Sequence, residues 1–334
     1  MDLTFASQFP ERSVANVKSA PLVSVTGASG FIGRRLLHTL TEAGHEVRAL
    51  VRGQPPQGAP ATVTWVRGDL GDPHALAALL DGADVVVHAA GAIKALSRSG
   101  FMTTNVAGTA TLAEVAAAQS TPPRLIYLSS LAAREARISP YAASKAAAEE
   151  AVRRLSHRLP VIVLRPPAVY GPGDPETLRI FRMAARGFLP VPAVAGARLS
   201  LAHVDDAAAA ILAAMTVDQI PDQPIEFDDG APQGHAWDEI ALAAGQALNR
   251  PVRTLRLPPG VFYAVGAASG LLAQITRRPT VLSRHKVAEI LHPDWVARPT
   301  PLPGYRPTWA LADGFRNTAD WAVSQGLVRM LRRS

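Results

Sequence analysis

The chain has 334 residues, of which 48% are hydrophobic and 18% charged, so it can bury a large core and is not globally disordered. It contains no cysteine, which excludes disulfides and thiolate metal sites and fits a reducing compartment. Its net charge is +7, but only 6% of its residues are aromatic and no nucleic-acid-binding motif accompanies the charge, so we expect no nucleic-acid partner.

Residues 1–20 are expected to form a flexible extension. Asp2 and Glu11 interrupt them, and no apolar run follows a basic start as it does in a secretory signal. No stretch of the chain reaches the roughly 18 uninterrupted apolar residues of a membrane-spanning helix. We therefore expect a cytoplasmic protein, with any membrane contact limited to the inner face.

A strand, a glycine-rich turn and a helix follow the extension. The strand is expected over 22–26, the turn over 27–33 and the helix over 34–43, and a second strand covers 45–51. A unit of this order and length predicts dinucleotide binding. The glycines allow a tight turn and close approach of the backbone to a pyrophosphate, which the helix N-terminus then faces.

The glycine spacing is Gly27-x-x-Gly30-x-x-Gly33, with Thr26 before it and Phe31-Ile32 inside it. This pattern resembles the extended short-chain dehydrogenase/reductase family, in its epimerase/dehydratase-like and 3β-hydroxysteroid dehydrogenase or dihydroflavonol reductase-like branch. The resemblance runs from about residue 22 to about 210 and more thinly beyond. It implies an α/β fold, a doubly wound parallel (Rossmann) sheet with a smaller, interleaved C-terminal substrate lobe.

The resemblance also implies a division of the chain and a set of cofactor contacts. The core would comprise 21–170 plus about 200–228, and the substrate lobe 171–199 plus about 229–334. The cofactor-binding residues implied by the family pattern are Gly27, Ser29, Gly30, Phe31, Ile32, Gly33, Arg52, Asp69, Leu70, Ala89, Ala90, Gly91, Tyr141, Lys145, Pro166, Pro167, Ala168 and Val169.

The residue that closes the second strand decides the type of cofactor in this family. An acidic residue there binds the 2′-hydroxyl of NAD, whereas an arginine accommodates the 2′-phosphate of NADP. This chain has Arg52 at that position, with Arg48 upstream. We therefore expect NADP, with NAD as the alternative.

Further strands are expected over 62–67, 84–91 and 124–130, with helices over 72–80 and 105–118 between them. Asn105 opens the second helix, where it could support a proton relay or hold a helix kink. His88 is expected to pack inside the fold. Ser129 and Ser130 end the last of these strands, where α/β sheets bind ligands. By the family pattern Ser130 is favoured as the residue that binds the substrate oxygen, with Ser129 as the alternative.

Tyr141 and Lys145 stand four residues apart in an alanine-rich stretch, which places them one turn apart on one helix face. Ser139 is a good N-cap and Pro140 a good first helical residue. A neighbouring ammonium group should lower the pKa of the phenol and make it an acid/base group. The resemblance implies that Ser130, Tyr141 and Lys145 are the catalytic residues.

A further strand and the turn Arg165–Gly173 match another family motif, and a last core strand is expected over 224–228. Asp205 and Asp206 head a helix after His203, where their charge favours the helix dipole. We interpret them in this way and not as ligands, and we expect no metal site.

The stretch 260–276 is strongly apolar and ends at Arg277-Arg278. It is either a buried helix of the lobe or an interfacial or substrate-channel helix with a basic end for lipid headgroups. The following segment, 279–287, resembles 3β-hydroxysteroid dehydrogenase-type proteins, which act on large hydrophobic substrates. We therefore expect a hydrophobic small-molecule substrate and peripheral membrane association through about 258–278.

Together these observations predict an NADP-dependent oxidoreductase that interconverts a ketone and a secondary alcohol on a lipid-like substrate, of the sterol-type or 3-oxo-sphingolipid (ceramide) reductase kind. A nucleotide-sugar epimerase or dehydratase uses the same Ser, Tyr and Lys and stays open as the alternative. A redox-silent structural subunit is the second alternative. The family often dimerises through two long helices, here about 103–118 and 140–156, although packing within one chain explains their alanine-rich faces equally well.

Overall fold

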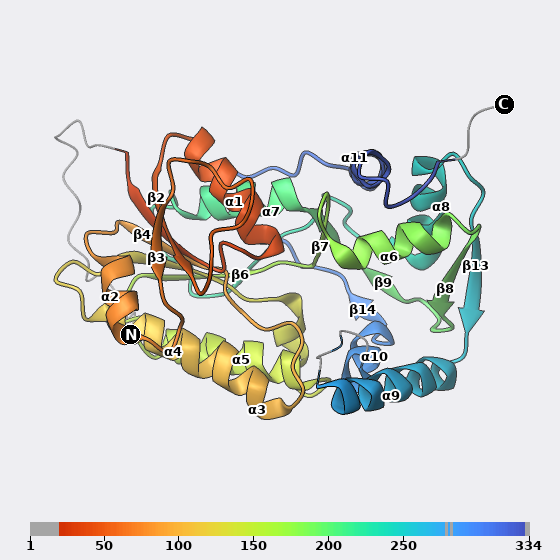
Figure 1. The fold of residues 1–334 in the computed structure, drawn as a ribbon, viewed down its shortest axis with the longest axis horizontal. Coiled ribbons are helices and arrows are strands. Elements are labelled where there is room, and N and C mark those ends of the chain that lie inside the picture. The colour runs from red at the N-terminus through yellow and green to blue at the C-terminus, as the bar shows by residue number, and fades with distance from the viewer. Residues whose placement is uncertain (1–19, 278–279, 281–282, 331–334) are drawn as a thin grey trace, which may run out of the picture.

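The computed structural model describes residues 20–277, 280 and 283–330 (Figure 1). The predicted N-terminal extension, apart from Ala20, lies outside the described residues, as do Arg278 and part of the segment 279–287.

A seven-stranded sheet of parallel strands forms the core, as the sequence predicts. Its spatial order is β11-β6-β5-β4-β1-β2-β3. The strands are β1 (Leu22–Thr26), β2 (Glu46–Val51), β3 (Thr64–Arg67), β4 (Val85–His88), β5 (Arg124–Leu128), β6 (Val161–Arg165) and β11 (Ile225–Glu226). The chain winds outward from β1 to β3 and then crosses to β4, so the order reverses between β1 and β4. Ligands of open α/β sheets bind at this reversal.

Helices cover both faces of the sheet (Figure 1). One face carries α1 (Phe31–Glu42) and α7 (Val204–Ala214), which pack against each other. The other face carries α2 (Pro73–Leu80), α4 (Gly108–Ala117) and α5 (Pro140–Arg153). Each layer buries the apolar stripe of its helices against the strands and forms a separate core cluster.

Local chemistry determines where α5, the helix that carries Tyr141 and Lys145, begins. Ser139 accepts a hydrogen bond from the backbone N–H of Ala142 at 3.0 Å and caps α5, and Pro140 is its first residue. A short helix α3 (Arg98–Phe101) and a π-helical turn (Met102–Ala107) lead into α4, and a 3₁₀ turn (Leu131–Glu135) follows β5. Because α4 and α5 pack against each other within the chain, dimerisation through them stays a prediction.

The remaining elements build a second lobe around its own apolar cluster, which includes Phe181, Ile240 and Phe315. They are β7 (Ala168–Tyr170), α6 (Pro175–Ala184), β8 (Phe188–Pro192), β9 (Arg198–Leu199), β10 (Leu201–His203), β12 (His235–Ala236), α8 (Trp237–Ala247), β13 (Arg253–Leu257), α9 (Pro259–Thr276), α10 (Arg284–Ile290), β14 (Asp294–Trp295) and α11 (Leu311–Ser324). Strand pairs β8–β13 and β7–β10, and the sheet β12-β9-β14, join segments that are distant in sequence. The residue boundaries predicted for the lobe stay a prediction.

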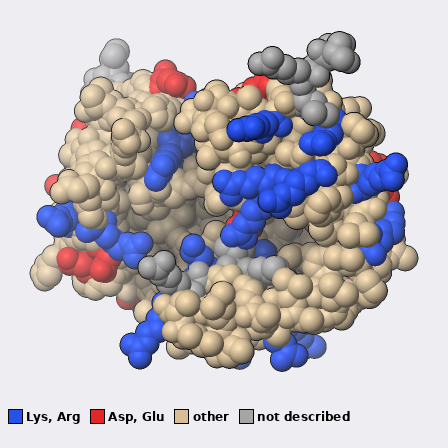
Figure 2. Space-filling model, turned by 45° about the vertical axis from the view of Figure 1, so that its right-hand side comes forward, with Lys and Arg blue, Asp and Glu red and all other residues tan. Residues whose placement is uncertain are grey.

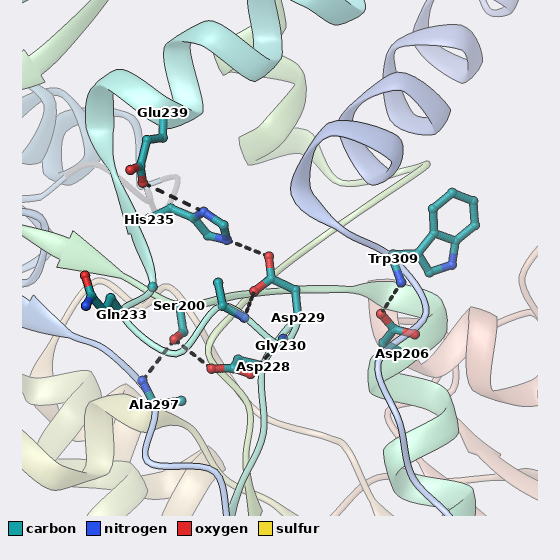
Figure 3. A network of polar contacts seen from close by, with 12 residues as sticks. Ser200, Asp206, Asp228, Asp229, Gly230, Gln233, His235, Glu239, Ala297 and Trp309 are labelled. Atoms are coloured by element: carbon teal, nitrogen blue, oxygen red, sulfur yellow. Dashed lines mark hydrogen bonds and ion pairs between the residues drawn. The ribbon is translucent and has the colours of Figure 1, made fainter.

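A network of polar contacts joins the loop after β11 to the lobe (Figure 3). Asp229 binds the His235 imidazole at 2.6 Å, and Asp228 accepts a hydrogen bond from Ser200 at 3.2 Å. Asp206, in the first turn of α7, accepts a backbone hydrogen bond from Trp309 at 3.1 Å. Through these contacts the three carboxylates have structural partners. Within the described ranges no cluster of side chains could hold a metal ion.

Helix α9 is the most exposed apolar element of the lobe. Only Gly266 and Ala273 are buried in it, whereas its Leu271, Leu272 and Ile275 side chains are exposed. The alternative that this stretch is a buried helix is therefore wrong. Among the described helices, none combines the length and apolar character needed to cross a bilayer.

Candidate active site

The predicted cofactor residues gather at one edge of the sheet because they follow the carboxyl ends of parallel strands. The Gly27–Gly33 turn follows β1, Arg52 follows β2, and Asp69 lies just beyond β3. On the other side of the order reversal, Ala89 follows β4 and Pro166 follows β6. Residues that are distant in sequence therefore line the crevice where such folds bind their ligands.

The glycine turn forms a cradle that a larger residue would fill. Gly27 has a φ of +75°, and a Cβ on it would lie 2.5 Å from the carbonyl carbon of Ala89. A Cβ on Gly33 would lie 2.1 Å from the Gly27 carbonyl oxygen. Helix α1 begins after Gly30 with no side-chain cap among the described contacts, so its first N–H groups face the crevice. This geometry fits a dinucleotide pyrophosphate.

His88 lies beneath this crevice and is fully buried, as predicted. Its ring nitrogens bond the hydroxyls of Thr26 at 2.6 Å and Thr109 at 2.8 Å. Burial and the charge of Lys145 lower the pKa of His88 to about 3, which keeps the ring neutral. It therefore ties β4 to β1 and α4 and is not an acid/base candidate.

Asn105 lies in the π-helical turn and has all its side-chain atoms engaged. It accepts a hydrogen bond from the Ala92 N–H at 2.6 Å and donates to the Ala92 carbonyl at 3.0 Å and to the Ser144 hydroxyl at 2.9 Å. These bonds tie the loop after β4 to helix α5 between Tyr141 and Lys145. They favour the interpretation that Asn105 holds a helix kink.

The two serines after β5 have different partners. The Ser129 hydroxyl is buried and donates to Glu149 at 2.5 Å. The Ser130 hydroxyl is half-exposed, accepts the Ala132 N–H at 3.2 Å and hydrogen-bonds the Tyr141 side chain. Only Ser130 is therefore directed at Tyr141.

Tyr141 and Lys145 share the inner face of α5, but their charges do not pair as predicted. Burial raises the pKa of Tyr141, although the hydrogen bond from Ser130 opposes this. Lys145 donates from Nζ to the Leu128 carbonyl at 2.7 Å and stands 4.5 Å over the Tyr127 ring. Burial lowers the pKa of Lys145 to about 7. The expectation of a lowered tyrosine pKa is thus wrong, because the effect of burial outweighs that of a lysine that is directed elsewhere.

Gly91 brings the loop after β4 next to this pair. A Cβ on Gly91 would lie 3.9 Å from Lys145 Nζ. The glycine cradle and Lys145 therefore lie at the same edge of the crevice. Tyr141 lies there too, because it is one turn from Lys145 on α5. Beyond β3, Leu70 packs on Gly108 of α4, and Asp69 accepts the Gly71 N–H at 2.7 Å.

Two groups of charged residues near Tyr141 and Lys145 were not predicted from the sequence. Glu149 follows Lys145 by one helical turn and binds Arg165 through two bonds of 2.8 and 2.6 Å. Lys286 and Glu289 arrive from α10 in the lobe, with Lys286 Nζ 6.0 Å from the Tyr141 ring centroid. The spacing Tyr141-x₃-Lys145-x₃-Glu149 could have revealed Glu149, because all three share a helix face. No local signal marks Lys286.

A glycine cradle at the sheet reversal, with Ser130, Tyr141 and Lys145 at the same edge, defines a nucleotide-cofactor oxidoreductase of the Rossmann type. The model of the NAD dependent epimerase/dehydratase family matches residues 23–225, and the chain belongs to that family. The protein is accordingly an NAD(P)-dependent oxidoreductase.

Two relatives and one solved structure show how far the similarity extends. A ceramide reductase of Caulobacter vibrioides is 41% identical over 310 residues, covering 91% of this chain and 95% of the relative. A 2-alkyl-3-oxoalkanoate reductase of Stenotrophomonas maltophilia is 32% identical over 209 residues, covering 56% of this chain and 63% of the relative. The crystal structure of gox2253 superimposes with a TM-score of 0.72 at 24% identity, covering 93% of this chain and all of that one, and supports the fold.

Proposed function

We propose that the protein uses NADPH to reduce a ketone on a hydrophobic, lipid-like substrate to a secondary alcohol, and that a 3-oxo-sphingolipid is the substrate class. The observation that carries the proposal is the Ser130–Tyr141 hydrogen bond beside Lys145 at the cofactor crevice. The similarity to a ceramide reductase over nearly the whole of both chains supports the substrate class.

The chain's own residues account for the proton side of the reaction. The hydroxyls of Ser130 and Tyr141 would bind the carbonyl oxygen, and Tyr141 would donate the proton to it. The raised pKa of Tyr141 keeps the phenol protonated, as a proton donor requires. Lys145 would hold the nicotinamide ribose. When bound, the nicotinamide supplies the hydride.

One assay tests the proposal. NADPH oxidation should accelerate with long-chain 3-oxo-sphingolipids and not with UDP-sugars. Turnover of UDP-sugars by protein that retains bound NAD through purification would instead support the epimerase alternative. That alternative finds little support in the loop after β5, because Glu135, its single carboxylate within 131–135, is exposed.

Arg52 is proposed to select NADP. Its side chain is exposed at the end of β2, where it is free to pair with a 2′-phosphate. Figure 2 shows Lys and Arg side chains gathered around a hollow in the molecular surface, a charge distribution that suits an anionic cofactor.

Arg52→Ala should therefore weaken NADPH binding by roughly 10- to 100-fold, the range of one charge-assisted hydrogen bond, and leave NADH binding nearly unchanged. Titration of nucleotide fluorescence measures both affinities. Arg154→Ala is the matched control, because it removes the same charge from a 75% exposed side chain just after the end of α5. Equal affinities of the unmodified protein for NADPH and NADH would overturn the NADP assignment.

Helix α9 is proposed to lie in the interface of an anionic membrane from which the substrate is taken. Val265, Leu271, Leu272 and Ile275 are 50–72% exposed on it, and Arg277 at its end is exposed as well. An apolar helical face with basic flanks binds the headgroup boundary of anionic bilayers.

Leu271→Glu should reduce co-sedimentation with vesicles of phosphatidylglycerol and phosphatidylcholine by roughly tenfold. The carboxylate replaces an apolar side chain that would be buried in the bilayer, and the lipid charge repels it. Leu242→Glu provides the control, since Leu242 is also 60% exposed but lies on α8. Equal loss in the two variants would show that α9 is not the membrane contact.

A further inference from the structure

We propose that Lys286, on lobe helix α10, is a positioning residue that supplies the positive charge beside Tyr141 and so sets the pH range in which Tyr141 transfers its proton. The inference rests on the role of Tyr141 in the proposed function, and it assigns part of that role to the lobe.

A chain of contacts fixes Lys286 relative to Tyr141. Lys286 Nζ lies 6.0 Å from the Tyr141 ring centroid and 2.7 Å from Glu289 Oε2. The other oxygen of Glu289 accepts the Ser139 hydroxyl at 2.5 Å, and Ser139 caps α5 two residues before Tyr141. The buried Glu289 thus binds both the lysine and the start of the catalytic helix.

The position of α10 is itself well supported. The Trp295 indole donates to the Glu289 carbonyl at 2.7 Å, and Val287 packs against Gly266 of α9. About two-fifths of the Lys286 side chain is exposed, and its ammonium group pairs with Glu289 and faces the Tyr141 ring. The ammonium group is therefore held near the phenol by its surroundings and is not a free surface charge.

Lys145 is poorly placed to supply this charge. Its ammonium is directed at the Leu128 carbonyl, and burial lowers the pKa of Lys145 to about 7, so the group is largely neutral above that pH. Burial is the largest single influence on the pKa of Lys286 and acts to lower it, but the ion pair with Glu289 and the charges of Tyr141 and Glu176 together raise that pKa. Lys286 is therefore the cation that persists at alkaline pH.

The groups that act electrostatically on the phenol or on its charged neighbours come from five parts of the chain. Lys286 and Glu289 on α10 act on Tyr141 itself, and Tyr127 on β5 is coupled to it. Glu176 on α6 acts on Lys286, whereas Glu149 on α5 and His88 on β4 interact with Lys145. Of the α10 pair, Lys286 lowers the pKa of Tyr141 and Glu289 raises it. Opposite signs from two neighbouring residues provide a test that a merely structural role would not satisfy.

The test uses charge-removing variants of the α10 pair. Lys286→Met should raise the pKa of Tyr141 by roughly one pH unit. This is the lower end of the range for a charge at this distance, since solvent screens the half-exposed Lys286. Glu289→Gln keeps an oxygen for Ser139 and should lower the same pKa. In Lys286→Arg the pKa of Tyr141 should stay near that of the unmodified protein. In the double variant Lys286→Met/Glu289→Gln the two opposite shifts should largely cancel.

Two measurements report the pKa. The ¹³Cζ chemical shift of labelled tyrosine follows ionisation directly, with and without NADP, and the signal is assigned through Tyr141→Phe. In ketone reduction, kcat should fall as pH rises through the Tyr141 pKa, since a proton donor is lost, so this fall should move to higher pH in Lys286→Met and to lower pH in Glu289→Gln.

Shifts of the same sign in the two single variants, or no shift in either, would overturn the proposal. The chemical-shift titration needs no turnover, so a wrong substrate class leaves this test intact. Conversely, the protein could reduce ketones while Lys286→Met leaves the pKa of Tyr141 unchanged. That result would support the proposed function and overturn the inference about Lys286.

Discussion

Tyr141→Phe should lower kcat for ketone reduction by about 10²- to 10⁴-fold while NADPH affinity changes by less than about threefold. That range is the usual contribution of a positioned general acid. The substitution removes the donated proton and the bond with Ser130 but keeps the ring that contacts Phe101 at 6.1 Å between centroids. Steady-state NADPH oxidation and nucleotide fluorescence give the two values.

The matched control is Tyr263→Phe, which removes a hydroxyl from a 39% exposed ring on α9. It should leave kcat on a detergent-dispersed substrate within about twofold. If Tyr141→Phe kept more than a tenth of the activity, the proton would have to come from another group, and Ser130 would be the first candidate.

The parts of the fold that local chemistry determines could be predicted. Gly27 and Gly33 are fixed by close backbone contacts, and Ser139-Pro140 fixes the start of α5. The gathering of strand-end residues also follows from sequence, because parallel strands joined by helices bring their carboxyl ends to one edge. This explains why the family, the fold class and the crevice could all be inferred.

The electrostatics of the site could not be predicted in the same way. Spacing alone indicates that Lys145 should assist Tyr141, but the direction of its ammonium depends on the Leu128 carbonyl and the Tyr127 ring of the neighbouring strand. The pKa of Tyr141 depends on burial, which the packing of the whole site decides. Lys286 lies 145 positions along the chain from Tyr141, and only the tertiary fold brings them together.

The environment of α9 was also undetermined by sequence. Its composition suits a buried helix and an interfacial helix equally, since both are apolar on most sides. The structure packs α10 against it and leaves Leu271, Leu272 and Ile275 exposed. Composition limits what a helix can contact, whereas the rest of the chain decides which of its faces is covered.

Glu149→Gln should lower the free energy of unfolding by about 3 kcal/mol, the lower end for removing one partner of a buried ion pair. The Glu149 side chain is only 3% exposed, and it binds Arg165, whose side chain is 18% exposed. Glutamine still accepts the Ser129 hydroxyl but no longer neutralises the arginine. Arg165 would retain only Glu226, at 3.8 Å, as an ionic partner among the described contacts. Urea denaturation measures the loss.

The adjacent Glu150 provides the control for this prediction. It pairs with Arg153 and Arg154 at 3.1 and 3.3 Å, but its side chain is 48% exposed, so Glu150→Gln should cost less than about 0.5 kcal/mol. Because Glu149 raises the pKa of Lys145, its loss should also move that pKa below about 7. If the two glutamine variants unfolded at the same urea concentration, the Glu149–Arg165 pair would not be what holds α5, and with it Tyr141 and Lys145, against β6.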